Sequence, residues 1–169
     1  LEGFNGRGRK PQMELARKLA ITDYPSPAGG CCFLTDENYT RKLRDLWAYR
    51  NNRDYSMEDI LLLKAGRHIR PAPHFKLMIG RDQSENLFLS GFRKGRMTIQ
   101  TKSTPGPLTL VEGKITAAED RLLACRIAAR YSKGKDLPPV QLTVDDNGVT
   151  EGVEVAPLPA HELPDHWHV

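Results

Sequence analysis

The spacing of apolar residues changes along this chain, from a helical repeat in the first third to mixed helical and alternating patterns afterwards. In residues 11–20, 37–48 and 57–65, apolar positions recur at intervals of three and four, which predicts three helices. Thr35 or Asp36 is expected to cap the second of them and Ser56 the third, which Gly66 ends. The first third of the chain is therefore predicted to be helical.

Beyond residue 74 the pattern alternates between apolar and polar positions in short runs, which is typical of half-exposed strands. Strands are predicted at 75–79, 96–102, 108–112, 140–144 and 149–155, and helices at 83–91 and from a Thr116–Glu119 capping box to about residue 131. Asp145–Gly148 between the last two strands has the composition of a hairpin turn. The fold class is α+β: a helical N-terminal segment followed by a small mixed α/β module with a mainly antiparallel sheet.

Prolines mark the boundary between these two parts. The run Ile69-Arg70-Pro71-Ala72-Pro73 predicts an extended hinge, because each proline disfavours helix in the residue before it. We therefore expect a helical segment over residues 1–70, a module over 74–158 and an irregular tail over 159–169.

Charge is distributed unevenly along the chain, although the net charge is only +4. All 25 Lys and Arg residues precede residue 136, and with 14 acidic residues there they give residues 1–135 a charge of +11. Residues 136–169 carry seven acids and no Lys or Arg, hence −7. Such a basic body favours a polyanionic partner, although a surface neutralised by the acidic segment explains the same charges.

The most unusual stretch is residues 25–37, in which two prolines, two glycines and the adjacent Cys31 and Cys32 precede a predicted helix. A cysteine just before a helix, with basic residues on that helix, has the setting of a reactive thiolate. A buried turn with small core thiols is the alternative. Three cysteines without an N-terminal export signal indicate a reduced, cytoplasmic protein, and no apolar run is long enough for a membrane span.

Residues 3–47 resemble the end of a PP-loop ATPase of the tRNA sulfurtransferase type, such as 4-thiouridine synthase and tRNA 2-thiouridylase. The matching strings are Gly6-Arg7-Gly8-Arg9-Lys10-Pro11-Gln12, Tyr24-Pro25-Ser26-Pro27-Ala28-Gly29-Gly30-Cys31, Leu34-Thr35-Asp36 and Arg41-Lys42-Leu43-Arg44-Asp45-Leu46. The resemblance implies tRNA modification by thiouridine synthesis, with Cys31 as the catalytic sulfur carrier.

Residues 74–158 resemble the RNA-binding domain of the NFACT family. The strings are Lys76-Leu77-Met78-Ile79-Gly80-Arg81-Asp82 followed by Asn86, and Ala128-Ala129-Arg130-Tyr131-Ser132-Lys133-Gly134-Lys135 followed by Val140, Val144, Val153 and Val155. The family's Asp-Leu-Trp-Phe-His strand is replaced here by Gly95-Arg96-Met97-Thr98-Ile99-Gln100, so this chain lacks that aromatic strand.

The ATP-binding Ser-Gly-Gly-x-Asp-Ser segment of PP-loop enzymes does not occur in this sequence. We therefore expect no cofactor in this chain, and ATP only in the complete enzyme, with the ATPase domain upstream of Leu1 or on another chain. The expected protein partner is that PP-loop ATPase domain or a separate sulfur donor. Adjacent cysteines also lack the spacing of a metal site, so no metal is expected.

The resemblance and the charge pattern together predict an RNA partner, specifically tRNA, and no membrane. The candidate RNA-binding residues are Arg81, Asn86, Arg93, Lys94, Arg96, Lys102, Arg130, Lys133 and Lys135. Capping roles for Arg81 and Asn86 remain an alternative. So does a non-catalytic scaffolding module whose acidic C-terminal hairpin docks a basic partner.

Overall fold

The computed structural model describes residues 10–23, 36–50, 54–102, 104–136 and 138–169. The chain forms two compact units, Leu1–Arg41 and Lys42–Val169. The first contains helix α1 (Lys10–Lys18) and the start of α2 (Glu37–Arg50), where the Asp36 carboxylate accepts hydrogen bonds from the amides of Asn38 and Tyr39. Asp36 is thus the residue that caps α2, as its position in the sequence predicts.

The second unit contains a six-stranded antiparallel sheet in the order β1-β2-β4-β3-β5-β6. Its strands are β1 (Arg67–Ala72), β2 (Phe75–Ile79), β3 (Thr98–Thr101), β4 (Leu108–Gly113), β5 (Val140–Asp146) and β6 (Val149–Val155). Its helices are the rest of α2, α3 (Met57–Leu62), α4 (Gln83–Ser90) and α5 (Ala118–Arg130). The structure confirms the α+β class with a mainly antiparallel sheet.

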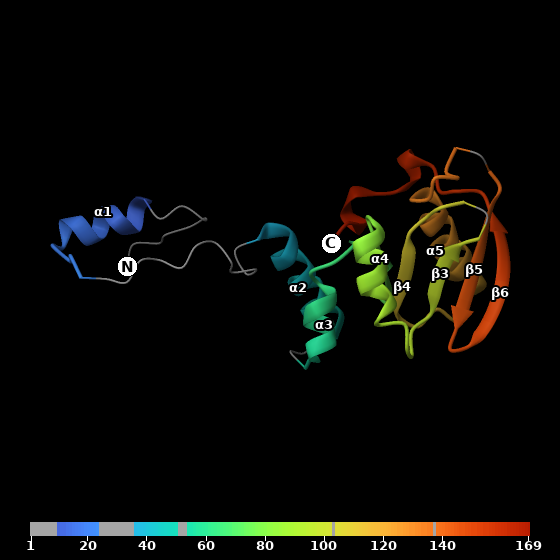
Figure 1. Cartoon of the computed structure of the whole chain (residues 1–169), viewed down its shortest axis with the longest axis horizontal. Coiled ribbons are helices and arrows are strands. Elements are labelled where there is room, and N and C mark those ends of the chain that lie inside the picture. The colour runs from blue at the N-terminus through green and yellow to red at the C-terminus, as the bar shows by residue number, and fades with distance from the viewer. Residues whose placement is uncertain (1–9, 24–35, 51–53, 103, 137) are drawn as a thin grey trace. The chain divides into compact units, whose positions relative to one another are not determined.

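Two layers of helix bury the two faces of this sheet to different extents. On one face, Ala124, Ile127 and Ala128 of α5 pack into a core with side chains from all six strands, to which β4 contributes Val111. On the other face, Leu62 of α3 and Leu89 of α4 pack with Met78 of β2 and with Leu108 and Leu110 of β4. Figure 1 shows α4 beside β4, with β5 and β6 at the far side of the sheet from α3.

Ion pairs also attach α2 to the sheet. The Lys76 ammonium is fully buried and lies 3.2 Å from Asp45 Oδ2 and 3.1 Å from Glu112 Oε2. Arg70 donates to both oxygens of Asp45. Burial alone would raise the pKa of the Asp45 carboxyl, but hydrogen bonding to Arg70 and the charge of Lys76 outweigh it and lower the pKa.

The expected proline hinge is part of the sheet. Residues 67–72 form β1, paired antiparallel with β2 from Arg67 opposite Ile79, with a bulge between Ile69 and Ala72. Pro71 is accommodated because β1 is an edge strand, where a missing backbone donor interrupts no second ladder.

Two other local expectations are refined by the structure. The Thr116 capping box is wrong: α5 begins at Ala118, its N-cap is Ala117, and no side chain caps it, because Thr116 lies one position too early. The tail is irregular but packed, with 3-10 turns at Ala160–Glu162 and Asp165–Trp167 and a bridge from His168 to Ile69. Trp167 packs against the larger core.

Candidate nucleic-acid interface

One half of the sheet has a face that no described helix of this unit covers. The register places Leu108, Gln100, Thr143 and Gly152 in one row across β4, β3, β5 and β6. Leu108 is buried beneath α4, whereas Gln100 and Gly152 are exposed and Thr143 is partly exposed. The cover supplied by α3 and α4 therefore stops at β4.

The neighbouring row repeats this arrangement. Leu110 of β4 is buried, and it aligns with Thr98 of β3, Asp145 of β5 and Thr150 of β6, all polar and at least partly exposed. We call the exposed surface formed by these strands the open face; its members are Thr98, Gln100, Gln141, Thr143, Asp145, Thr150, Gly152 and Glu154, two of which are carboxylates. Side chains alternate along a strand, so the other face of the same strands carries Ile99, Leu142 and Val144, packed under α5.

Two of the predicted basic residues lie on the open face. The Arg93 guanidinium donates to Gln100 Oε1 at 3.3 Å, which places its charge over the middle of β3. Lys102 lies two residues beyond Gln100, and its side chain is exposed. Its backbone amide donates to the carbonyl oxygen of Gln141. Two residues of strand span about 7 Å, so these cations form a short line along β3.

The loop after α5 adds two lysines at the end of the sheet where Lys102 lies. Lys133 and Lys135 are exposed on either side of Gly134, which is buried. The loop is held by hydrogen bonds from the amide of Lys133 to Pro105 O, at 3.0 Å, and from that of Gly134 to Ser132 Oγ, at 3.1 Å. A β-carbon at Gly134 would lie 2.9 Å from Thr104 Oγ1, so glycine allows the close packing that fixes the two lysines.

Arg130 lies next to this loop at the end of α5. One of its terminal nitrogens donates to Leu158 O at 3.1 Å, a neutral partner. Together with Lys135 it lines a cleft of about 470 Å³, whose other walls are Asp136, Pro138 and residues 156–160.

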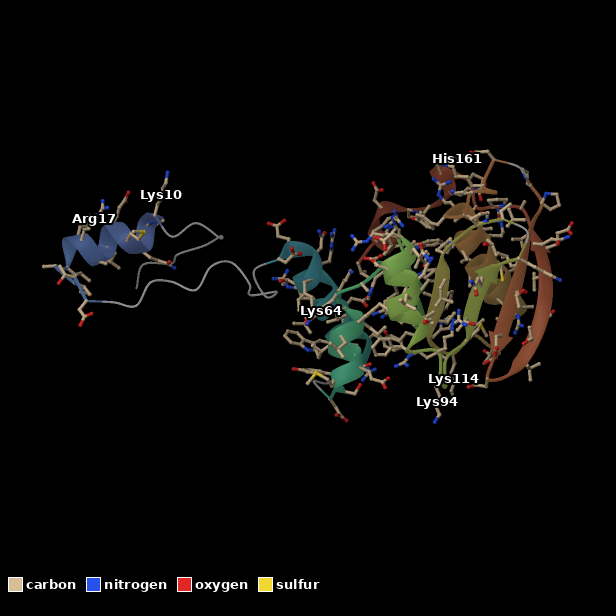
Figure 2. The ribbon with its side chains drawn as sticks, viewed as in Figure 1. Lys10, Arg17, Lys64, Lys94, Lys114 and His161 are labelled. Atoms are coloured by element: carbon tan, nitrogen blue, oxygen red, sulfur yellow. The ribbon has the colours of Figure 1, made fainter. Side chains whose placement is uncertain are left out.

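The remaining basic candidates occupy the opposite end of the sheet or bond within the protein. Lys94 is exposed in the loop before β3 and, as Figure 2 shows, points away from the same end as Lys114, opposite His161. Arg96 donates to Phe92 O and pairs with Glu58 at 3.2 Å, so it ties that loop to α3. Lys94, Arg96 and the β5–β6 turn line a cleft of about 510 Å³, and Asp145 forms part of its wall.

Arg81 and Asn86 both make structural contacts within the module. Arg81 pairs with Glu85; burial alone would raise the pKa of that carboxyl, but the Arg81 hydrogen bonds outweigh it and lower the pKa. Asn86 Oδ1 accepts a hydrogen bond from the amide of Leu108 at 3.0 Å. The local alternative describes the Arg81–Glu85 contact, whereas Asn86 bonds a residue 22 positions away at the start of β4. RNA contact by either residue stays a prediction.

The sulfur-carrier prediction cannot be placed, because Cys31 and Cys32 lie outside the described residues. Cys125 is fully buried in α5, and burial raises the pKa of its thiol to about 11. It therefore remains a neutral thiol at neutral pH and is a core residue.

The uncharged members of the open face were missed by reasoning that looked for charge. Gln100, Gln141 and Thr143 alternate with apolar residues in two strands, so the signal was present in the sequence. The sequence did not indicate which face of β3, β5 and β6 would be left uncovered by α4.

Other kinds of site receive no support from the described residues. No group of three or more His, Cys, Asp or Glu side chains among them is placed to hold a metal ion. Nor does that part of the chain include a helix with the length and apolarity to cross a bilayer. A third cleft, of about 410 Å³, lies between Tyr49, Arg70 and Trp167, where Arg70 stacks on the Tyr49 ring at 4.2 Å.

Comparison with known proteins adds a family match. Residues 66–168 match the family model described as NFACT protein RNA binding domain. A solved structure, the C-terminal part of the fibronectin/fibrinogen-binding protein from Streptococcus suis, is similar in fold, with a TM-score of 0.52 and 17% identity over 62% of this chain. The match spans about half of that chain, 49%. No curated protein matches this sequence.

Proposed function

This chain belongs to the family of NFACT protein RNA-binding domains, and from that premise we propose that RNA lies across the open face and the Lys133–Lys135 loop. The observation that carries the proposal is that Lys102, Lys133 and Lys135 are exposed and have no ion-pair partner within the described ranges. Lysines without partners lose no ion pair when they bind phosphate, and they release counterions from the RNA.

The arrangement of these charges fits one continuous contact. Arg93 and Lys102 lie along β3, and the β3–β4 connection bonds the Lys133 loop through Pro105 O. Two regions distant in the sequence, residues 93–102 and 133–135, thus supply cations to adjoining surfaces. Phosphate contacts of this kind give affinity and orientation without sequence preference.

The competing scaffolding function depends on free acids in the C-terminal segment, and several of those acids already have partners. Glu151 pairs with Arg121 at 2.6 Å and Glu162 with Arg126 at 3.4 Å, both on α5. Asp145 accepts the Gly148 amide in the hairpin turn. The segment therefore neutralises the α5 side of its own module, which favours RNA over a basic protein as the ligand.

The finer proposal is that the RNA is tRNA and that the whole protein takes part in its thiolation. The support is the resemblance of residues 3–47 to PP-loop sulfurtransferases, with Cys31 as sulfur carrier and ATP bound elsewhere in the complete enzyme. A Cys31→Ser change should abolish sulfur transfer in that enzyme and leave tRNA affinity unchanged. Loss of tRNA affinity with retained thiolation would contradict this assignment.

The test of RNA binding is a salt titration. We expect the chain to bind total tRNA with log K falling linearly in log salt, by roughly 0.7–0.9 per phosphate contact. Substituting Lys102, Lys133 and Lys135 together by Gln should lower the affinity and reduce the slope by about 2–3.

The matched control is Lys114→Gln, an exposed lysine at the opposite end of the sheet, which should leave the slope unchanged. Absence of binding at low salt would contradict the RNA proposal, and an unchanged slope in the triple variant would contradict its placement.

A further inference from the structure

The open face is built entirely without aromatic side chains. Strands β3, β5 and β6 have the sequences TIQT, VQLTVDD and VTEGVEV, and none contains Phe, Tyr or Trp. Proteins that bind unpaired RNA on a sheet hold the splayed bases by stacking them on aromatic rings. The strands of this surface provide no aromatic ring, and the Arg93 guanidinium that lies over β3 donates to Gln100 Oε1.

What the open face offers instead is hydrogen bonding. Gln100 and Gln141 each present a side-chain amide that both donates and accepts, and Thr143, opposite Gln100 in the same row and two residues from Gln141 along β5, has a hydroxyl that does the same. These groups are complementary to a ribose 2′-hydroxyl and to phosphate oxygens. Hydroxyl contacts distinguish RNA from DNA, and the adjoining lysines bind phosphate in either.

The shape of the face also suits a broad ligand. Three strands spaced at about 4.8 Å make a surface roughly 10 Å wide. Near its outer edge, a β-carbon built on Gly152 meets no atom within 4 Å, so the backbone of β6 is exposed there. The minor groove of A-form RNA is wide and shallow, and it displays the 2′-hydroxyls of both strands.

We infer that this domain binds base-paired RNA, placing the open face along the minor groove of an A-form stem and reading 2′-hydroxyls and phosphates independently of sequence. The inference rests on the proposed function, because it specifies which RNA the open face takes. It assigns Gln100, Gln141 and Thr143 to ribose contacts, and Lys102 with the Lys133–Lys135 loop to the phosphates of the same stem.

An aromatic pair elsewhere in the module, Phe88 and Phe92, is one alternative platform for unpaired bases. Phe88 is 38% exposed, and its ring centroid lies 5.1 Å from that of Phe92. Phe92 packs on the cluster that contains Leu62 and Met78, between α3, α4 and the sheet. That pair is therefore on the covered half of the module, apart from the open face, and a variant there separates the two modes of binding.

The experiment compares three probes at one salt concentration: an RNA hairpin with a stem of about 12 base pairs, a DNA hairpin of the same sequence, and an unpaired RNA of equal length. We expect the RNA hairpin to bind at least tenfold more tightly than the unpaired RNA, with scrambling of the stem sequence having little effect. It should also bind about fivefold more tightly than the DNA hairpin, since each lost hydrogen bond changes affinity about two- to tenfold.

Two variants locate the contact. Gly152→Leu introduces a side chain where space is open, so the fold is unstrained and hairpin binding should fall about tenfold or more by obstruction. Gln100→Ala with Gln141→Ala should bring RNA and DNA hairpins to within about twofold of each other. Phe88→Ala should change neither result.

The outcomes separate this inference from the proposed function. Failure of all probes to bind would contradict both. Lysine-dependent binding that favours unpaired RNA, or that falls in Phe88→Ala but not in Gly152→Leu, would contradict the base-paired assignment alone.

Discussion

Replacing Asn86 by Ala should destabilise the fold without affecting RNA contact. The Asn86 side chain accepts the amide of Leu108, a residue 2% exposed at the start of β4, at 3.0 Å. Leu108 O in turn accepts the amide of Gly80 at 3.1 Å, and a β-carbon at Gly80 would lie 2.1 Å from Asn86 Oδ1. The side-chain amide of Asn86 thus fills the space between the end of β2 and the start of β4.

The size of the effect follows from leaving that Leu108 amide without an acceptor. An unsatisfied buried donor costs about 1–3 kcal/mol. For a chain of this length each kcal/mol changes Tm by about 2–4 °C, so we expect a decrease of roughly 2–12 °C. Asn86→Asp keeps an acceptor oxygen and should retain most of the stability.

The assay is thermal unfolding by circular dichroism, with tRNA affinity measured at a temperature where every variant is folded. We expect a lower Tm for Asn86→Ala and an affinity within about twofold of the unsubstituted protein, a change of less than 0.5 kcal/mol. An unchanged Tm with lost affinity would refute the reasoning and make Asn86 an RNA contact.

Two further predictions concern buried titratable groups. His68 is fully buried, with Nε2 bonded to the carbonyls of Leu62 and Ala65; burial first, then neighbouring lysine charges, hold its pKa well below 6.5. Only the unfolded chain takes up that proton, so the unfolding free energy should fall by about 1.4 kcal/mol per pH unit below pH 6.5, until the folded-state pKa is reached. A denaturant series across pH checks this. The dependence on pH should weaken in His68→Gln and persist in the control variant His161→Gln, at an exposed position. An equal slope in His68→Gln and in the unsubstituted protein would contradict the prediction. In the native chain at neutral pH, a mild alkylating agent should label Cys31 and spare Cys125, whose thiol has its pKa raised to about 11; mass spectrometry of labelled peptides reads the site, and labelling of Cys31 only after denaturation would make it a structural thiol.

The sequence was most informative where periodicity and burial agree. The alternation in 96–102 and 140–155 predicted strands, and the Asp145–Gly148 hairpin forms with the full register from Val140 opposite Val155 to Asp146 opposite Val149. The prolines of 69–73 indicated extended backbone correctly. Their position at a sheet edge could not be predicted, because it depends on which strand pairs with β2.

The candidate interface was predictable in composition but less so in arrangement. Charge counting found Lys102, Lys133 and Lys135, and the structure brings their segments together through the β3–β4 connection. It could not find that Arg81 pairs with Glu85, or that the Asn86 side chain is used within the fold, since both depend on side-chain geometry around one helix turn. The extent of the open face depends on the length of α4, which a local pattern does not reveal.

The central claim, that RNA lies on the open face, is tested most directly by hydrogen exchange with and without a base-paired RNA hairpin. The account predicts slowed exchange in β3, β5 and the 132–135 loop, with α3 and α4 unchanged. Protection confined to α3, α4 and the Phe88–Phe92 pair, with β3 and β5 unaffected, would contradict it.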